Sequence, residues 1–130
     1  KDILVETGII TAIEKKLEVT RGTTVHEGKG QCVSIGWMDL HARFCDPGFE
    51  HKEDIESGIA ASIQGGFTGL AVMPSTSPFM HSKSTVEYLM RKAEGKCVDL
   101  HPVGAITTNG EGKEMAEMFQ NADQSRQRNF

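Results

Sequence analysis

Long apolar runs, paired cysteines and an excess of basic residues are all missing from this sequence. No uninterrupted apolar stretch approaches the roughly 20 residues that a membrane-spanning helix needs, so we expect no membrane span. The 14 Lys and Arg residues are scattered among 18 Asp and Glu residues, which gives a net charge of −4. Because nucleic-acid binders concentrate positive charge on one surface, we expect no nucleic-acid partner.

Cysteine is scarce as well, with three residues that are widely spaced and form no C-x-x-C pair. This number and spacing argue against a disulfide framework and against a structural zinc knuckle. We therefore interpret Cys32, Cys45 and Cys97 as free thiols of a cytoplasmic protein. No signal peptide or targeting motif is recognisable. The sequence begins with Lys1 rather than Met, so a piece of a longer chain is one interpretation.

The 130 residues, 38% of them apolar, suit one globular domain. Short runs rich in β-branched residues at 3–5, 9–13 and 17–20 predict strands of a small antiparallel sheet. A further, largely apolar run over residues 32–44 predicts a strand. It ends in a loop at Pro47, which cannot donate to a sheet ladder.

The period of the pattern changes after residue 50. Ile55, Ile59 and Ile63 recur every four residues, which predicts a helix that Gly65-Gly66 ends. The compact apolar run at 67–73 is typical of a strand buried on both faces. Strands of this kind favour a parallel sheet.

A second helix is predicted to start at a capping box formed by Ser84 and Glu87 and to end at Gly95. Its apolar face would consist of Val86, Leu89, Met90 and Ala93. Residues 97–107 then predict a third strand, and Lys113 to Phe119 the start of a third helix with Met115 and Met118 facing the core. The polar residues 120–130 predict a loop or disorder.

Strands that alternate with helices indicate parallel strands with right-handed crossovers. Periodicity alone leaves an open doubly wound sheet and a (β/α) barrel as alternatives. A closed eight-fold barrel needs about 250 residues, so three strand-helix units cannot close one alone. The chain would then have an uncovered inner face that something must bury.

Asp39, His41 and Arg43 carry the most informative pattern, because residues two apart in a strand point the same way. They would project to one side near the end of the strand, where barrel active sites gather. From residue types alone, a hydrogen-bonded structural His is favoured over a metal ligand.

Four segments, in order along the chain, closely resemble the first part of dihydroorotases in the amidohydrolase superfamily. They are Asp39-Leu40-His41, Asp46-Pro47-Gly48, Gly65-Gly66-Phe67-Thr68 and Met73-Pro74-Ser75-Thr76. The resemblance implies an α/β fold: residues 1–36 would be a β-sandwich segment and 37–119 the first three units of a partial TIM-type barrel. The tail at 120–130 is left unplaced.

The resemblance also implies a reaction, the reversible cyclisation of N-carbamoyl-L-aspartate to dihydroorotate in pyrimidine biosynthesis. The family uses one or two zinc ions, held by His side chains and usually by a carbamylated Lys. Its first barrel strand carries Asp-x-His-x-His-x-Arg, in which both His residues bind metal and the Arg binds a substrate carboxylate. The metal polarises the amide and activates a water molecule.

This sequence departs from that motif at three positions. His41 matches the first metal ligand, but Arg43 stands at the second, Cys45 replaces the substrate-binding Arg, and Ser75 replaces the Asn of M-P-N-T. Arg43 has no lone pair to offer a metal. We therefore expect His41 to be a vestigial ligand, no zinc and no catalytic residue in this chain, and degenerate substrate-binding positions at Cys45 and Ser75. A linked hypothesis is that Arg43 replaces the metal as a cation, paired with Asp39 or Asp46.

Three functions remain open from the sequence. The chain could be a portion of an active dihydroorotase, or a non-catalytic pseudoenzyme that forms homo-oligomers or associates with a carbamoyltransferase. The substitutions favour the second. An unrelated small α/β module is the third, and the collinear motifs argue against it. The remaining histidines have no partner at ligand spacing, so no role is assigned to His26, His51, His81 and His101. A reactive Cys45 is likewise disfavoured.

Overall fold

A computed structural model of the protein describes residues 1–116, which fall into two compact units. The first comprises Lys1–Ser34 and the second begins at Ile35. The tail predicted at 120–130, and Met118 and Phe119 of the predicted third helix, lie outside the described residues. The domain limits predicted at residues 36 and 119 stay predictions.

The first unit is a β-hairpin. Strands β1 (Asp2–Glu6) and β2 (Ile9–Glu14) pair antiparallel, as the sequence predicts. Thr7 and Gly8 form the turn with φ values of 50° and 81°, which suits a two-residue hairpin loop. The strand predicted at 17–20 is wrong: the backbone N–H of Leu17 donates to the Asp2 side chain at 2.9 Å instead of entering a ladder.

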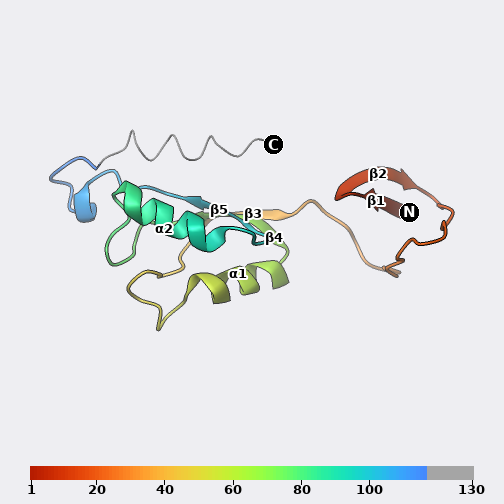
Figure 1. Ribbon diagram of the computed structural model, residues 1–130, viewed down its shortest axis with the longest axis horizontal. Coiled ribbons are helices and arrows are strands. Elements are labelled where there is room, and N and C mark those ends of the chain that lie inside the picture. The colour runs from red at the N-terminus through yellow and green to blue at the C-terminus, as the bar shows by residue number, and fades with distance from the viewer. Residues whose placement is uncertain (117–130) are drawn as a thin grey trace. The chain divides into compact units, whose positions relative to one another are not determined.

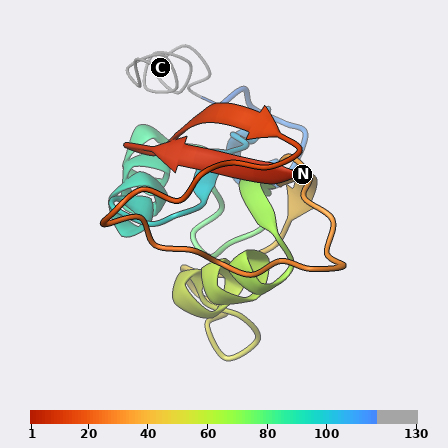
Figure 2. The same cartoon turned by 90° about the vertical axis from the view of Figure 1, so that its right-hand side faces the viewer.

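The second unit contains a three-stranded parallel sheet with two helices. Strands β3 (Trp37–Ala42), β4 (Phe67–Val72) and β5 (Asp99–Pro102) lie in that order across the sheet. Helix α1 (Ile55–Gln64) connects β3 to β4, and α2 (Lys83–Ala93) connects β4 to β5 (Figures 1 and 2). The predicted alternation of strands and helices is confirmed to this point, and the described residues 1–116 form a small α/β fold with two sheets and two α-helices.

Both helices pack on the same face of this sheet, because their apolar side chains join those of the strands in one core cluster. Its largest fully buried members are Ile55, Leu70, Val72, Met80, Leu89 and Val98. On the other face, a Cβ atom at Gly69 would lie 3.6 Å from Met38 Cγ and 3.8 Å from His101 Nε2. Met38 and His101 are exposed, so the described residues of the second unit, 35–116, leave that face uncovered.

Several predicted boundaries need correction. The strands predicted at 32–44 and 97–107 are confined to β3 and β5. Helix α2 begins two residues earlier than predicted, with Ser82 as its N-cap. The backbone N–H of Ser82 donates to Thr85 Oγ1 at 3.4 Å, so a hydroxyl takes the role that the sequence pattern gave to Glu87.

The third helix predicted from Lys113 does not begin within residues 113–116. Met115 instead forms an antiparallel bridge with Thr107, and the backbone N–H of Ala116 donates to the Ile106 carbonyl at 3.0 Å. Gly110 and Gly112, with φ values of 71° and 73°, turn the chain back on itself. This reversal brings apolar Met115 into a loop rather than a helix.

The barrel and sandwich parts of the predicted architecture stay predictions. Within residues 1–116, neither helix has the length and apolar character needed to cross a membrane.

Candidate functional site

The chain that leaves β3 alternates between exposed and buried side chains. Ala42, Phe44 and Asp46 are 8%, 5% and 3% exposed. The residues between them are the predicted site residues His41 and Arg43, which are exposed, and Cys45, which is half-buried. Since successive side chains of an extended chain point to opposite sides, the buried series holds the site residues outward.

Phe44 is the apolar anchor of this segment. Helix α1 accommodates its ring with a glycine, because a Cβ atom at Gly58 would lie only 2.4 Å from Phe44 Cε1. Any larger side chain at Gly58 would push the ring out of the core. The close approach of α1 to the Phe44 ring therefore depends on the glycine at position 58.

Arg43 and His41 contact each other directly. The guanidinium Nε donates to His41 Nε2 at 3.4 Å, which uses the ring lone pair that a metal ion would need. The His41 backbone N–H donates to Asp39 Oδ1 at 2.8 Å. Within residues 1–116 Arg43 forms no ion pair with Asp39 or Asp46, so the hypothesised pairing with either carboxylate is wrong.

The described residues do not fit the zinc ion that the resemblance implies. Protein zinc sites use three or four converging side chains. In residues 1–116 no three His, Cys, Asp or Glu side chains come together as a set of ligands. His41 has the Arg43 guanidinium beside its Nε2, and a guanidinium has no lone pair to give a metal ion.

Ser75 belongs to the loop that follows β4 and is half-buried. This loop is joined to the loop after β3, because the backbone N–H of Ser77 donates to the Pro47 carbonyl at 2.8 Å. Gly48 permits the approach, since a Cβ atom there would lie 2.3 Å from the Ser77 carbonyl oxygen. Among the described residues no hydrogen bond joins Ser75 itself to Cys45, so the structure brings the loops together without pairing these two side chains.

The loop after β5 continues the same edge. The backbone N–H of Ala105 donates to the Met80 carbonyl at 2.9 Å, and Gly110 packs against the Phe79 ring. Three consecutive loops thus lie at the carboxyl ends of parallel strands, which is where active sites of α/β proteins form. The arrangement provides a platform for binding or catalysis.

Asp46, which the sequence analysis named only as a motif residue and a hypothesised partner of Arg43, has contacts that the sequence did not predict. Its carboxylate accepts a hydrogen bond from Tyr88 Oη at 2.7 Å and one from the Ile55 backbone N–H at 3.4 Å. Lys92 Nζ lies 3.9 Å from the same carboxylate. The hydrogen bond to Asp46, together with burial, raises the pKa of Tyr88. No local sequence pattern predicts the contact between Asp46 and Tyr88, because the two residues are 42 positions apart.

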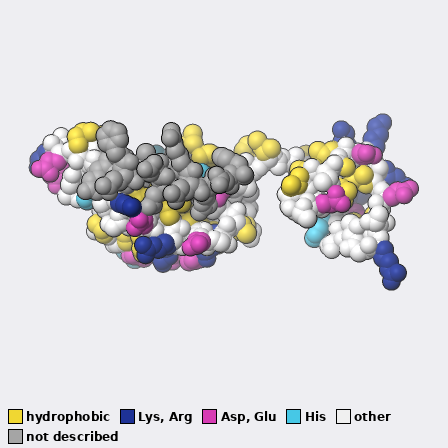
Figure 3. Space-filling model, turned by 45° about the horizontal axis from the view of Figure 1, so that its top comes forward, with side chains coloured by type: hydrophobic (Ala, Val, Ile, Leu, Met, Phe, Trp, Pro, Cys, Tyr) yellow, Lys and Arg dark blue, Asp and Glu magenta, His cyan; other side chains and the backbone are white. Residues whose placement is uncertain are grey.

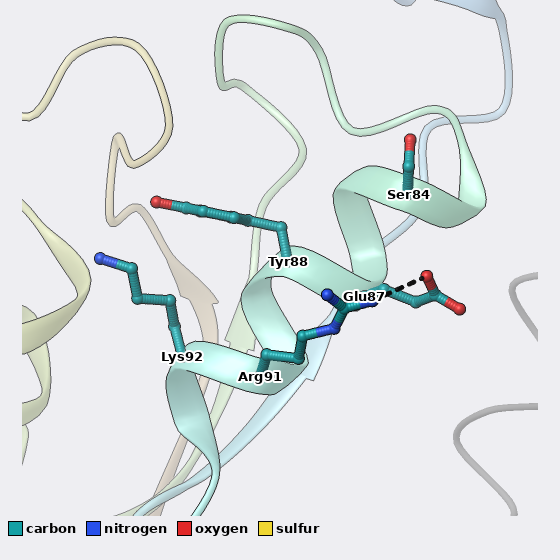
Figure 4. A pocket seen from close by; sticks show the side chains of 5 residues that line it. All are labelled: Ser84, Glu87, Tyr88, Arg91 and Lys92. Atoms are coloured by element: carbon teal, nitrogen blue, oxygen red, sulfur yellow. Dashed lines mark ion pairs between the residues drawn. The ribbon is translucent and has the colours of Figure 1, made fainter.

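Tyr88 and Lys92 also line a shallow hollow on α2. Both project to one side of the helix, while Arg91 and Glu87 form an ion pair with an N–O distance of 3.6 Å (Figure 4). Lys92 Nζ lies 5.6 Å from the centre of the Tyr88 ring. Electrostatic interaction with Tyr88 and with the Asp46 carboxylate raises the pKa of Lys92, so this amine stays protonated beside the buried carboxylate.

The remaining histidines do not join a cluster within the described part of the chain. His51 contacts the edge of the Phe49 ring, with ring centres 6.5 Å apart. The buried Nδ1 atom of His81 has no hydrogen-bond partner among residues 1–116.

The family model and the curated proteins that match this chain point to the same family. The family model described as "Dihydro-orotase-like" matches residues 30–125. The chain is 43% identical over 118 residues to the dihydroorotase of Acetivibrio thermocellus and 42% identical to that of Geobacter sulfurreducens over the same length. It is 38% identical to the dihydroorotase of Citrifermentans bemidjiense. These alignments cover 90% of this chain but only 28% of each relative.

Proposed function

The chain belongs to the dihydroorotase-like family, and from this premise we propose that it is a member whose metal site has become a hydrogen-bonded Arg–His pair. The family reaction would be the interconversion of N-carbamoyl-L-aspartate and dihydroorotate in pyrimidine biosynthesis. In this proposal the chain neither holds zinc at His41 nor performs that reaction itself. It is a cytoplasmic pseudoenzyme.

The contact between Arg43 Nε and His41 Nε2 at 3.4 Å carries this proposal. A zinc ion at His41 would have to displace a permanently charged group tethered two residues away. A divalent ion 4 Å from a unit positive charge is repelled by on the order of 2 kcal/mol even at the dielectric constant of water. The same position supplies no second ligand, so coordination loses an attraction and gains a repulsion.

Cys45 supports the same conclusion on the substrate side. The resemblance places a carboxylate-binding Arg at this position, and a thiol cannot form the two parallel hydrogen bonds of a guanidinium. Losing one such charge-assisted contact costs about 1.5–3 kcal/mol of binding free energy. Ser75, in place of the family's Asn, is shorter and has no amide to offer.

The proposal extends to the architecture. Strands β3, β4 and β5 with their helices would be the first units of a TIM-type barrel, and the N-terminal hairpin would belong to a β-sandwich segment. The parallel strand order and the placement of both helices on one face support the barrel. The uncovered face of the sheet would then point toward the barrel interior.

Metal titration tests the proposed loss of the zinc site. We expect calorimetry to show no stoichiometric zinc binding that depends on His41 in the wild-type chain. Arg43→His should increase zinc affinity by at least about tenfold, the equivalent of 1.4 kcal/mol for an added imidazole ligand. The double variant His41→Ala, Arg43→His is the control and should lose the gain. Tight binding by the wild type that His41→Ala abolishes, or hydrolysis of dihydroorotate with added zinc, would overturn the proposal.

A second candidate is a scaffold that associates with a carbamoyltransferase. Exposed apolar side chains on β3 favour an association function, since Trp37, Met38 and Leu40 are 57%, 53% and 72% exposed. Co-elution with an aspartate carbamoyltransferase in size-exclusion chromatography, lost on Leu40→Asp, is the expected result. A larger species formed by the chain alone would instead identify a homo-oligomer, and elution as a separate monomer contradicts both.

A further inference from the structure

We propose that the Asp46 carboxylate is a positioning residue that holds the loop presenting Arg43 and Cys45 against α2 and the start of α1. The inference rests on the proposed function only in treating Arg43 and Cys45 as site residues. It assigns Asp46 a role that differs from its appearance in the sequence as part of a turn.

The contacts of Asp46 come from two separate helices. Tyr88 Oη, in the middle of α2, donates to Oδ1 at 2.7 Å. The Ile55 backbone N–H, at the first position of α1, donates to Oδ2 at 3.4 Å. Lys92 approaches Oδ2 to 3.9 Å from the next turn of α2. Tyr88 and Lys92 project to the same side of α2 in Figure 4, which allows both to reach one carboxylate.

Because Asp46 is buried, its hydrogen bonds fix both the position and the orientation of its carboxylate. Asp46 is only 3% exposed, so water cannot replace a lost donor. A buried carboxylate stays favourable only while its oxygens keep their partners, and hydrogen bonds to a charged group weaken steeply with angle and distance. An apolar side chain could fill this space but would not fix the orientation of the loop.

The backbone beside Asp46 needs such a constraint. Cys45 has a φ of 56°, in the left-handed region that residues other than glycine rarely adopt. Its neighbours Phe44 and Asp46 are both buried and anchored, and its carbonyl accepts a hydrogen bond from the Phe49 N–H at 2.8 Å. Release of Asp46 would free one of the two anchors, so Cys45 would relax and Arg43 would lose its fixed direction.

The composition of the chain provides two reporters. Tyr88 is the single tyrosine, so tyrosinate absorbance reports the Asp46 hydrogen bond without interference from another phenol. Replacement of Cys32 and Cys97 by Ser leaves Cys45 as the single thiol, so its rate of reaction with Ellman's reagent reports the loop.

The experiment compares Asp46→Asn and Tyr88→Phe in the chain in which Cys32 and Cys97 are replaced by Ser. Asp46→Asn should lower the pKa of Tyr88 toward that of an ordinary tyrosine and speed the modification of Cys45 by about tenfold, as expected for a locally opened loop. Tyr88→Phe should speed modification by about threefold. This milder variant keeps the carboxylate charge beside Cys45, so its effect reports the release of the loop rather than a change in thiol ionisation.

Two control variants separate positioning from general stability. Glu56→Gln removes the exposed ion pair with Lys96 and should change neither reporter. Val86→Ala enlarges a buried space in α2 and destabilises the fold without removing a contact of Asp46. It should leave the rate at Cys45 unchanged under conditions where the chain stays folded.

The inference is overturned if Tyr88→Phe leaves the rate at Cys45 unchanged, or if Val86→Ala raises it equally. It also fails if Tyr88 titrates as an ordinary tyrosine in the wild type. If Asp46→Asn does not fold, the result for Tyr88→Phe decides. Neither reporter depends on zinc or turnover, so zinc binding at His41 would overturn the proposed function and leave this inference standing.

Discussion

The first unit, residues 1–34, is called the hairpin unit here, and the second, in which two helices cover a sheet, the layered unit. Both units contain similar apolar residues, but these are exposed in the hairpin unit and buried in the layered unit. In residues 1–34 no residue is buried, and apolar side chains lie at the surface of this unit (Figure 3). Ile9 and Ile10 are 65% and 55% exposed. In the second unit Ile55 and Leu89 have no exposed surface. Two strands alone provide no second layer, whereas a sheet covered by two helices does. Burial therefore follows from the number of layers rather than from the residue type.

The polar contacts differ in the same way. In the hairpin unit Asp2 binds the Leu17 N–H, 15 residues away, and the contact is exposed. In the layered unit Asp46 binds Tyr88 across 42 residues and is buried. A buried polar contact ties distant elements together and is costly to break. We expect mutations to have large effects in the layered unit and small effects in the hairpin.

The largest contrast is expected from truncation of apolar side chains. Leu89→Ala should lower the free energy of unfolding by about 2–5 kcal/mol, because it leaves a cavity in the core. Ile10→Ala should change it by about 0.5 kcal/mol or less, as for other exposed sites. Urea unfolding followed by the fluorescence of Trp37, the single tryptophan, measures both. Equal losses would show that the hairpin has a buried interface of its own.

Adding a methyl group at a glycine sharpens the same contrast. Gly58→Ala should destabilise the chain by about 1–3 kcal/mol, because the new Cβ atom collides with the Phe44 ring. Gly28→Ala in the hairpin unit is the matched control, with only the flexible Gln31 side chain 3.6 Å away. Its effect should be within about 0.5 kcal/mol of zero. Circular dichroism during thermal unfolding distinguishes the two, and a stabilised Gly58→Ala variant would contradict the packing described for Phe44.

The smallest expected effect is a dependence of stability on pH at the start of α1. The Asp54 side chain accepts a hydrogen bond from the Ser57 backbone N–H at 2.7 Å, and this bond lowers the pKa of the carboxyl group. A carboxyl whose pKa is lower in the folded state stabilises the fold above the pKa of the unfolded chain. This stabilisation is lost as the pH falls through the lower, folded value.

The variant Asp54→Asn retains a capping oxygen but cannot titrate, so it should unfold with a weaker pH dependence than the wild type between neutral and acidic pH. Urea unfolding at a series of pH values measures this difference. Identical pH profiles for the two chains would show that Asp54 does not contribute to acid sensitivity.

Local patterns were sufficient for several elements. Runs of β-branched or apolar residues located both strands of the hairpin and β4, and helical spacing of apolar residues located α1 and α2, all within a few residues. They failed where the outcome depends on distant partners. Residues 17–20 have strand-like composition but no neighbouring strand, and Met115 pairs with Thr107 in a reversed loop. Periodicity indicates which side chains could lie on one face of an element. Whether the element forms also depends on a neighbouring strand or helix that covers this face.

The amino-acid sequence by itself determined the relationship to dihydroorotases and the presence of Arg43 two residues after His41. Only the tertiary structure decided that Arg43 donates a hydrogen bond to His41 rather than pairing with Asp39 or Asp46. It also decided that the Asp46 carboxylate accepts a hydrogen bond from Tyr88. Residue identity sets which charges and lone pairs exist. Which of them meet depends on how the packing of α1 and α2 against the sheet directs each side chain, and no short-range pattern contains that information.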